Sequence, residues 1–288
     1  MKLYLAGCQS RVWILHAYLL GEKEQGVNNL ERYVDAGVSR RNGSVDIPHS
    51  CISRGGGIPN WKPYILESFY YANKDDIQRL LPYFGDFLLD SGAFTFMQNS
   101  KAHVDWNRYL EEYAEFINAY KIDKFFELDI DNVVGYEEVL KLRNKLEHLT
   151  GKQCIPVWHT SRGKEEYLKT CNEYPYVAIG GIAIKTIKST QYKYFPWFIE
   201  QAHKRGAKVH GLGFTNLEGI KKYHFDSVDS TSWTTGNRFG CIYKFNGKTI
   251  VKYGKPEGTR IPKDKVRELA VNNFVEWCKF QQYADTHL

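Results

Sequence analysis

The chain has 288 residues and a formal net charge of +6, with 43% hydrophobic and 25% charged residues. This balance is typical of a soluble globular protein and excludes a disordered, collagen-like or coiled-coil chain. No apolar run approaches the roughly 18 residues of a membrane span, and the start is too quickly polar for a secretory leader. We therefore expect no membrane partner, a cytoplasmic location and, from the length, a single domain over residues 1–288.

Short apolar or aromatic segments recur along the chain, each followed by a polar or helical stretch. Eight are expected to be strands: 3–6, 64–70, 87–89, 125–128, 154–157, 176–179, 208–210 and 225–228. Four intervening stretches carry apolar residues at helical spacing: 104–119, 136–149, 191–205 and 217–223. Alternating strands and helices indicate parallel βαβ units. Eight of them predict an α/β fold of the (β/α)8 TIM-barrel type rather than an open, doubly wound sheet.

Two regions interrupt this alternation. Residues 21–63 form a long insertion after the first strand, rich in Gly and Arg, and loops of this length are usually functional or disordered. At the other end, 241–245 and 248–253 read as strands joined by Asn246-Gly247, a strong hairpin signal. An amphipathic helix is expected from about 263 to 283, so residues 241–288 should form a hairpin and a C-terminal helix.

Candidate functional residues gather where the expected strands end, which is the catalytic rim of a barrel. They are Asp90, Asp129, Asp131, His159, Gly180, Gly181, His210, Asp226 and Asp229. Any single Asp could simply cap a helix. Carboxylates at three separate strand ends instead suggest metal binding, glycoside chemistry or recognition of a donor-rich ligand.

Four segments together resemble successive signatures of the tRNA-guanine transglycosylase superfamily. They are Asp90-Ser91-Gly92-Ala93-Phe94, the run 176–183 ending in Gly180-Gly181-Ile182-Ala183, His210-Gly211-Leu212-Gly213 and Val228-Asp229-Ser230-Thr231-Ser232-Trp233. Their order and spacing match over about residues 85 to 240. The resemblance implies a (β/α)8 barrel, in agreement with the strand count.

The resemblance also implies roles for individual residues. Asp90 would be the general acid/base, and Phe94 would stack on the bound base. Asp129 would read the amino-bearing edge of a guanine-like base, and the Gly181 N–H would donate to its carbonyl. Either Asp229 or Asp226 would be the nucleophile that attacks C1′ of the sugar; the motif and its spacing favour Asp229.

Several departures separate this chain from the tRNA enzymes. The zinc motif of three cysteines and a histidine is absent, so we expect no structural metal, and no cofactor is implied. His159 stands where those enzymes carry a glutamine, and His210 where they carry an apolar residue. With no long C-terminal extension, the chain is most similar to the shorter 7-deazaguanine DNA-modification transglycosylases.

Basic residues are concentrated after the expected nucleophile. Residues 231–265 hold eight Lys or Arg against two acidic residues, and they include Arg238, Lys244, Lys248 and Lys252. A charge run is usually a solvated face. Here it overlaps an aromatic hairpin, which favours a phosphate-binding ribbon. Arg40, Arg41 and Arg54 in the insertion could form a second contact.

The sequence therefore predicts an enzyme that cleaves the N-glycosidic bond of a base in DNA. The leading version is exchange, with a free 7-deazapurine as the second substrate. The alternatives are a hydrolytic glycosylase that excises a modified base from foreign DNA, a transglycosylase acting on tRNA, and a non-catalytic barrel that only binds nucleic acid. In each catalytic version the base must leave the stack to reach the rim.

Overall fold

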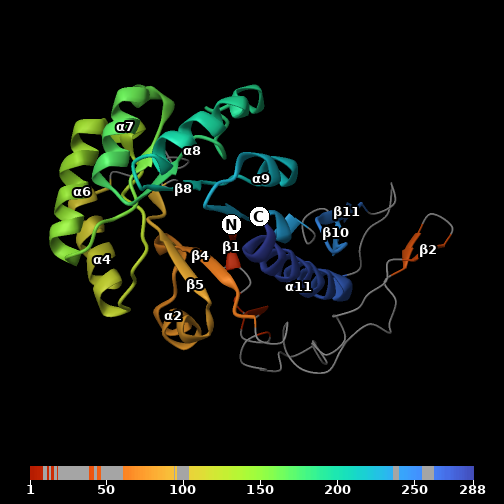
Figure 1. Cartoon of the computed structure of the whole chain (residues 1–288). Coiled ribbons are helices and arrows are strands. Elements are labelled where there is room, and N and C mark those ends of the chain that lie inside the picture. Colours follow the sequence, from red (N-terminus) through yellow and green to blue (C-terminus); the bar gives the residue numbers. More distant parts are fainter. Residues whose placement is uncertain are drawn as a thin grey trace.

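The structure is a computed structural model (Figure 1) that describes residues 1–8, 12, 14, 15, 18, 61–93, 95, 104–235, 240–254 and 263–288. For residues 39–41, 44–46 and 263–268 it gives the backbone alone. Most of the expected insertion at 21–63 thus lies outside the described residues. Within the described ranges, no helix is long and apolar enough to cross a membrane.

A curled parallel sheet forms the centre of the molecule. Its strand order is β5-β4-β1-β9-β8-β7-β6, and every pairing in it is parallel. The strands are β1 (Lys2–Ala6), β4 (Tyr64–Ser68), β5 (Asp86–Asp90), β6 (Val157–Trp158), β7 (Tyr176–Ile179), β8 (Lys208–Gly211) and β9 (Ser227–Ser230). Single bridges from Leu89 to Phe125 and from Phe126 to Ile155 connect β5 to β6. The fold is therefore of the (β/α)8 TIM-barrel type.

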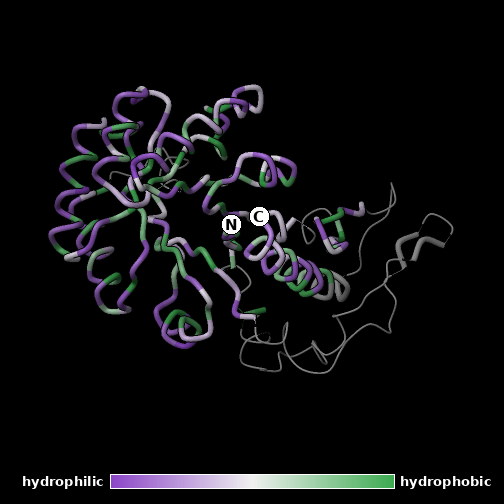
Figure 2. The backbone as a smooth tube through the Cα atoms, viewed as in Figure 1, coloured by the Kyte–Doolittle hydropathy of each residue, from purple (hydrophilic) through white to green (hydrophobic). Residues whose placement is uncertain are grey.

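Helices surround the strands (Figure 1). The α-helices are α2 (Lys74–Leu80), α4 (Trp106–Ala119), α5 (Asp131–Val134), α6 (Tyr136–Thr150), α7 (Gly163–Glu173), α8 (Phe195–His203), α9 (Leu217–Tyr223) and α11 (Lys263–His287). The 3-10 turns are η3 (Phe69–Tyr71), η4 (Leu81–Tyr83), η5 (Thr160–Arg162), η6 (Ser189–Tyr194) and η7 (Ser232–Thr234). In Figure 2 hydrophilic and hydrophobic residues alternate along each helix, as expected where one face is buried.

Helix α4 illustrates why these elements form where they do. Asp105 precedes it, and its side chain accepts hydrogen bonds from the N–H groups of Asn107 and Arg108, which caps the first turn. Leu110, Tyr113, Ala114, Phe116 and Ile117 follow at helical spacing and are all buried. The helix thus begins two residues later than the sequence predicts, because residue 105 serves as the cap.

The C-terminal part also differs from its prediction. Strands β10 (Ile242–Phe245) and β11 (Ile250–Tyr253) pair antiparallel, with Phe245 opposite Ile250. The connection is therefore four residues long rather than the expected Asn246-Gly247 turn. The Asn246 side chain accepts hydrogen bonds from two backbone N–H groups of this loop, at Lys248 and Thr249. These side-chain hydrogen bonds stabilise the four-residue loop, which forms instead of the two-residue turn.

Helix α11 packs beside β1, and its last turns reach the amino ends of β1 and β4. The buried Gln281 side chain donates to the carbonyl oxygens of Leu3 and Tyr64 and accepts from the Tyr64 N–H and the Trp61 indole. It therefore satisfies backbone groups of two neighbouring strands at once. A second pair of short strands, β2 (Ser39–Arg41) and β3 (Ser44–Asp46), lies in the insertion.

Candidate functional site

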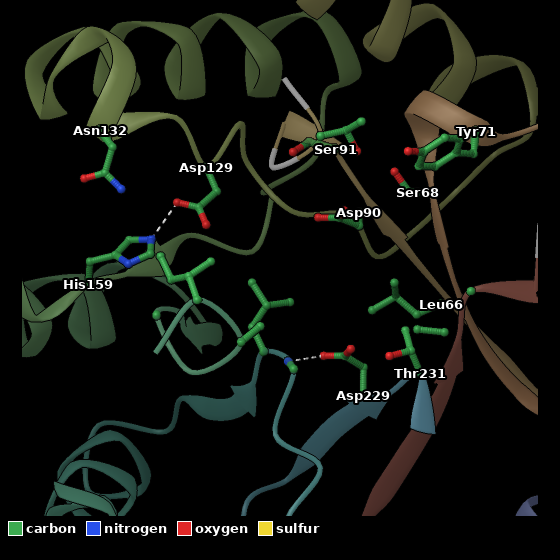
Figure 3. Close-up of a pocket in the computed structure, with 18 residues that line it drawn as sticks. Leu66, Ser68, Tyr71, Asp90, Ser91, Asp129, Asn132, His159, Asp229 and Thr231 are labelled. Carbon is green, nitrogen blue, oxygen red and sulfur yellow. Dashed lines mark hydrogen bonds and ion pairs between the residues drawn. The ribbon is translucent and has the colours of Figure 1, made fainter. Parts of the chain in front are cut away.

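One cavity of about 290 Å³ opens at the carboxyl ends of the strands. Residues that follow or end different strands line it, among them Asp90, Asp129, His159, Gly181, Gly213 and Asp229. Figure 3 shows the three carboxylates and His159 around the same hollow. The fold thus brings together residues that are far apart in the sequence. This agrees with the prediction that functional residues gather where the strands end.

Asp90 ends β5 in a strongly desolvated position. Burial and the charges of Asp129 and Asp229 together raise the pKa of its carboxyl to about 7, although a hydrogen bond from the Gly92 N–H (3.2 Å) opposes them. Gly92 has φ +75°, and a Cβ there would lie 2.5 Å from the Cβ of Tyr70. A glycine is therefore required for the turn that follows Asp90. Near neutral pH, Asp90 can hold and release a proton.

Asp229 lies inside β9, where two neighbouring groups contact one of its carboxylate oxygens. Its Oδ1 accepts a hydrogen bond from the Gly213 N–H (2.5 Å), and the Nε2 of His210 lies 3.2 Å from the same oxygen. Oδ1 of Asp229 is thus contacted by a backbone N–H and by an imidazole nitrogen. The cavity therefore contains one carboxyl that readily carries a proton and one that is supplied with donors.

Asp129 and His159 form a close pair on another side of the cavity, with 2.6 Å between Oδ1 and Nε2. Burial lowers the pKa of His159, but this hydrogen bond and the charges of Asp129 and Asp131 outweigh it, so the net shift is upward. Gly180 makes room for the ring, because a Cβ there would lie 2.7 Å from the imidazole Cε1. The pair offers a carboxylate acceptor to a polar ligand, and His159 holds that carboxylate through its Nε2.

Asp131 lies beside this pair but is engaged elsewhere. The Arg162 guanidinium donates to it at 3.2 Å, and Asn132 rather than Asp131 lines the cavity. Ligand atoms of Asp129, Asp131 and His159 lie within 4.8 Å of one another, a spacing that could hold a metal ion. Arg162 and His159 already supply positive charge to both carboxylates. Metal independence stays a prediction.

Like Asp131 and Gly180, the predicted site residues Asp226 and His210 lie outside the cavity lining. Asp226 precedes β9, and its carboxylate accepts from the Val209 N–H (2.8 Å) and lies 2.8 Å from His203 Nε2, at the amino end of the strands. The alternative assignment of the nucleophile to Asp226 is therefore wrong, and Asp229 is the candidate. His210 is fully buried beneath Asp229, so the expected base contact is also wrong.

The predicted phosphate-binding residues are only partly described. Lys248 and Lys252 are exposed, whereas Lys244 lies 3.8 Å from the buried Glu276. The backbone of Arg40 and Arg41 is in β2, but their side chains, like Arg54, Arg238 and the expected stacking residue Phe94, lie outside the described residues.

Two aromatic side chains of the hairpin, both on β10, pack against α11. Tyr243 contacts Trp277, and Phe245 contacts Phe280 and Tyr283 of α11. They therefore support the hairpin and are not available to stack on bases. The Tyr243 hydroxyl is 2.8 Å from the Thr235 hydroxyl, which joins the hairpin to the loop after β9.

Some cavity residues were assigned no role from the sequence. Ser68, Tyr71 and Thr231 line the cavity, and Tyr71 is 50% exposed at its edge. Ser68 falls in a segment that reads as one long strand, 64–70, and Tyr71 directly follows that segment. In the structure β4 stops at Ser68, and the following 3-10 turn directs the next residues to the rim.

Comparisons with known proteins leave the activity open. No family model matches the chain, and no curated protein matches it. Among solved structures, a putative fructose-1,6-biphosphate aldolase from Coccidioides immitis is similar, with a TM-score of 0.49 and 10% identity over 99% of this chain and 89% of that one. The carboxyl transferase domain of Rhizobium etli pyruvate carboxylase gives a TM-score of 0.41 and 15% identity over 76% of this chain and 41% of that one. Neither similarity assigns a residue or an activity to this chain.

Proposed function

We propose that this protein cleaves the N-glycosidic bond of a base in DNA, with Asp229 as nucleophile and Asp90 as general acid. The observation that carries the proposal is the contrast between two carboxyls in one cavity. Burial raises the pKa of Asp90 to about 7, whereas Asp229 is supplied with hydrogen-bond donors. A pair of titratable groups in opposed environments is how glycosidases divide acid and nucleophile.

The proposed reaction uses both groups in its first step. Asp229 attacks C1′, the C1′–N bond breaks, and the electron pair passes to the base. The proton of Asp90 then neutralises the leaving base. The product is a covalent deoxyribosyl-enzyme and a free base. The transition state resembles an oxocarbenium ion, which the nearby carboxylates stabilise.

The dimensions and chemistry of the cavity suit a base with its sugar. At about 290 Å³ it lies at the small end of the roughly 300–1,000 Å³ typical of ligand pockets. The Asp129 carboxylate can accept from an amino-bearing base edge, and His159 beside it holds that carboxylate in place. The net charge of +6 and the basic segment 231–265 favour a polyanionic partner.

The second step decides between exchange and hydrolysis. In exchange, the ring nitrogen of an incoming 7-deazapurine-type base attacks C1′, its proton passes to the Asp90 carboxylate, and Asp229 departs. In hydrolysis, water attacks C1′, its proton passes to Asp90, Asp229 departs and an abasic site remains. Exchange is the leading version; excision from foreign DNA, action on tRNA and binding without catalysis are the alternatives.

Mass spectrometry of nucleosides from DNA incubated with the protein tests the proposal. We expect a new deazapurine nucleoside when a 7-deazaguanine-type base is added, and loss of this product in Asp229→Asn and Asp90→Asn. Alkali-labile sites without added base would indicate hydrolysis. Unchanged DNA, with tRNA converted instead, would overturn the DNA assignment. Unchanged DNA and tRNA with intact binding would support the non-catalytic barrel.

A further inference from the structure

A chain of buried hydrogen bonds runs beneath the cavity, inside the barrel. His210 Nε2 lies 3.2 Å from Asp229 Oδ1, and its Nδ1 lies 2.5 Å from the Ser227 hydroxyl. The Ser227 hydroxyl is in turn hydrogen-bonded to the Tyr176 hydroxyl. His210 and Ser227 are at most 1% exposed. Neighbouring rings at 5.3–6.1 Å, from Phe126 and Tyr4, enclose the imidazole.

The donor and acceptor roles in this chain follow from the chemistry of its members. An ionised carboxylate only accepts, so His210 must carry its proton on Nε2. In the neutral ring Nδ1 is then an acceptor, and the Ser227 hydroxyl must donate to it. The remaining lone pair on Ser227 accepts from Tyr176. When Asp229 is ionised and His210 is neutral, the direction of every hydrogen bond in the chain is fixed.

Both donors to Asp229 converge on one oxygen. The Gly213 N–H and the imidazole of His210 are each paired with Oδ1, and no hydrogen bond to Oδ2 occurs among the described residues. We propose that His210 is a positioning residue, held in its Nε2–H tautomer by Ser227 and Tyr176, that leaves Oδ2 of Asp229 as the attacking atom. The role of Oδ2 in the reaction rests on the proposed function. The directions of the hydrogen bonds do not depend on it.

The arrangement serves both halves of the proposed reaction. When Oδ2 bonds to C1′ and the C1′–N bond breaks, Oδ1 becomes the carbonyl oxygen of an ester. The same two donors then stabilise negative charge on Oδ1 as the C1′–Oδ2 bond breaks and its electron pair returns to the carboxylate. Preorganised donors at a developing charge are the usual means of lowering such a barrier.

Substitution of His210 separates positioning from packing. His210→Leu removes the donor, whereas His210→Gln keeps an N–H at the reach of Nε2. We expect His210→Leu to slow formation of the covalent intermediate about 10- to 100-fold with little change in KM, the effect of losing a hydrogen bond to a charged group. His210→Gln should restore most of the rate.

A matched control exists at the end of helix α8. His203 pairs with Asp226 at the amino end, outside the cavity, so His203→Leu should leave the rate unchanged. Thermal melts will show which variants fold. Equal losses in folded His210→Leu and His210→Gln, or none in either, would overturn the positioning role.

Nitrogen NMR of the imidazoles tests the assignment without any activity. At pH 7.5 we expect His210 as the Nε2–H tautomer, and a mixture of tautomers in Ser227→Ala. An Nδ1–H tautomer in the unaltered protein would overturn the inference. If the tautomer is as expected but DNA and tRNA are untouched, the proposed function fails and the reaction half of the inference falls with it.

Discussion

The proton on Asp90 couples the site to the stability of the fold. Burial raises the pKa of this carboxyl from 3.8 to about 7. A raised pKa means that the folded state binds the proton more tightly, so this stabilisation is complete below about pH 4 and is lost as the pH rises to about 7. Asp90→Asn removes the dependence. We therefore expect this variant to melt several degrees higher than the unaltered protein at pH 8, and no higher at pH 4.

The same group should govern the pH dependence of cleavage. As general acid, Asp90 must be protonated, so we expect the rate to fall about tenfold for each pH unit above about 7. Single-turnover rates between pH 6 and 9 provide the measurement. A rate that keeps rising through pH 8 would exclude Asp90 as the proton donor.

Gly180 offers a test of how His159 is held. A Cβ at this position would lie 2.7 Å from both His159 Cε1 and Val157 Cγ1. Gly180→Ala should displace the ring from Asp129, destabilise the protein by about 1–3 kcal/mol and weaken base binding. Gly254→Ala is the control, because a Cβ there meets nothing within 4 Å. Urea unfolding and binding of free bases would detect the difference; equal behaviour of the two variants would contradict it.

At the level of elements, strand register explains which predictions succeeded. Strand β7 has the predicted bounds, because an apolar run and its pairing coincide there. Strand β9 begins two residues later than predicted: Ser227 pairs with Lys2, while Phe225 packs with Phe195 and Phe214 outside the strand. Apolar content alone cannot reveal this pairing. Because β9 spans Ser227–Ser230, Asp229 lies in the strand and lines the cavity, whereas Asp226 lies before the strand begins.

Some features of the site could be predicted from the sequence and others could not. Carboxylates at strand ends were predictable, because barrel geometry dictates where those ends meet. The contribution of the Gly213 N–H was not, since a backbone donor leaves no trace in residue type. Nor was the burial of His210 predictable, because side chains alternate across a strand and a histidine suits either side.

The hairpin of β10 and β11 gives a prediction about nucleic-acid binding. Lys248 and Lys252 are exposed on it, whereas Lys244 lies near Glu276. If the first two contact phosphates, Lys248→Gln with Lys252→Gln should weaken DNA binding and reduce the slope of log K against log salt by up to about 1.8. Lys141→Gln, an exposed lysine on α6, is the control. An unchanged slope in the double variant would indicate a merely solvated face.

For the whole molecule, Gln281 is a critical point of attachment. Its side-chain amide lies near the C-terminal end of the chain. It makes hydrogen bonds to four groups of β1, β4 and the segment before β4. Gln281→Met preserves volume but leaves those buried groups unpaired, which should cost about 2 kcal/mol or more. The neighbouring, partly exposed Gln282 provides the matched control, Gln282→Met. Urea unfolding compares the two, and equal stabilities would show that the attachment contributes little.

The pairing of β1 with β9 also has a consequence in time. Tyr4 lies in register with Asp229, so the strand that carries the candidate nucleophile pairs with a strand from the first residues of the chain. During synthesis at about 5–20 residues per second, Leu3 and its neighbours wait more than about ten seconds for this partner. Asp229 is therefore synthesised after the strands that carry most of the other cavity residues. A nascent chain stalled before residue 227 therefore contains Asp90 and Asp129 but not Asp229.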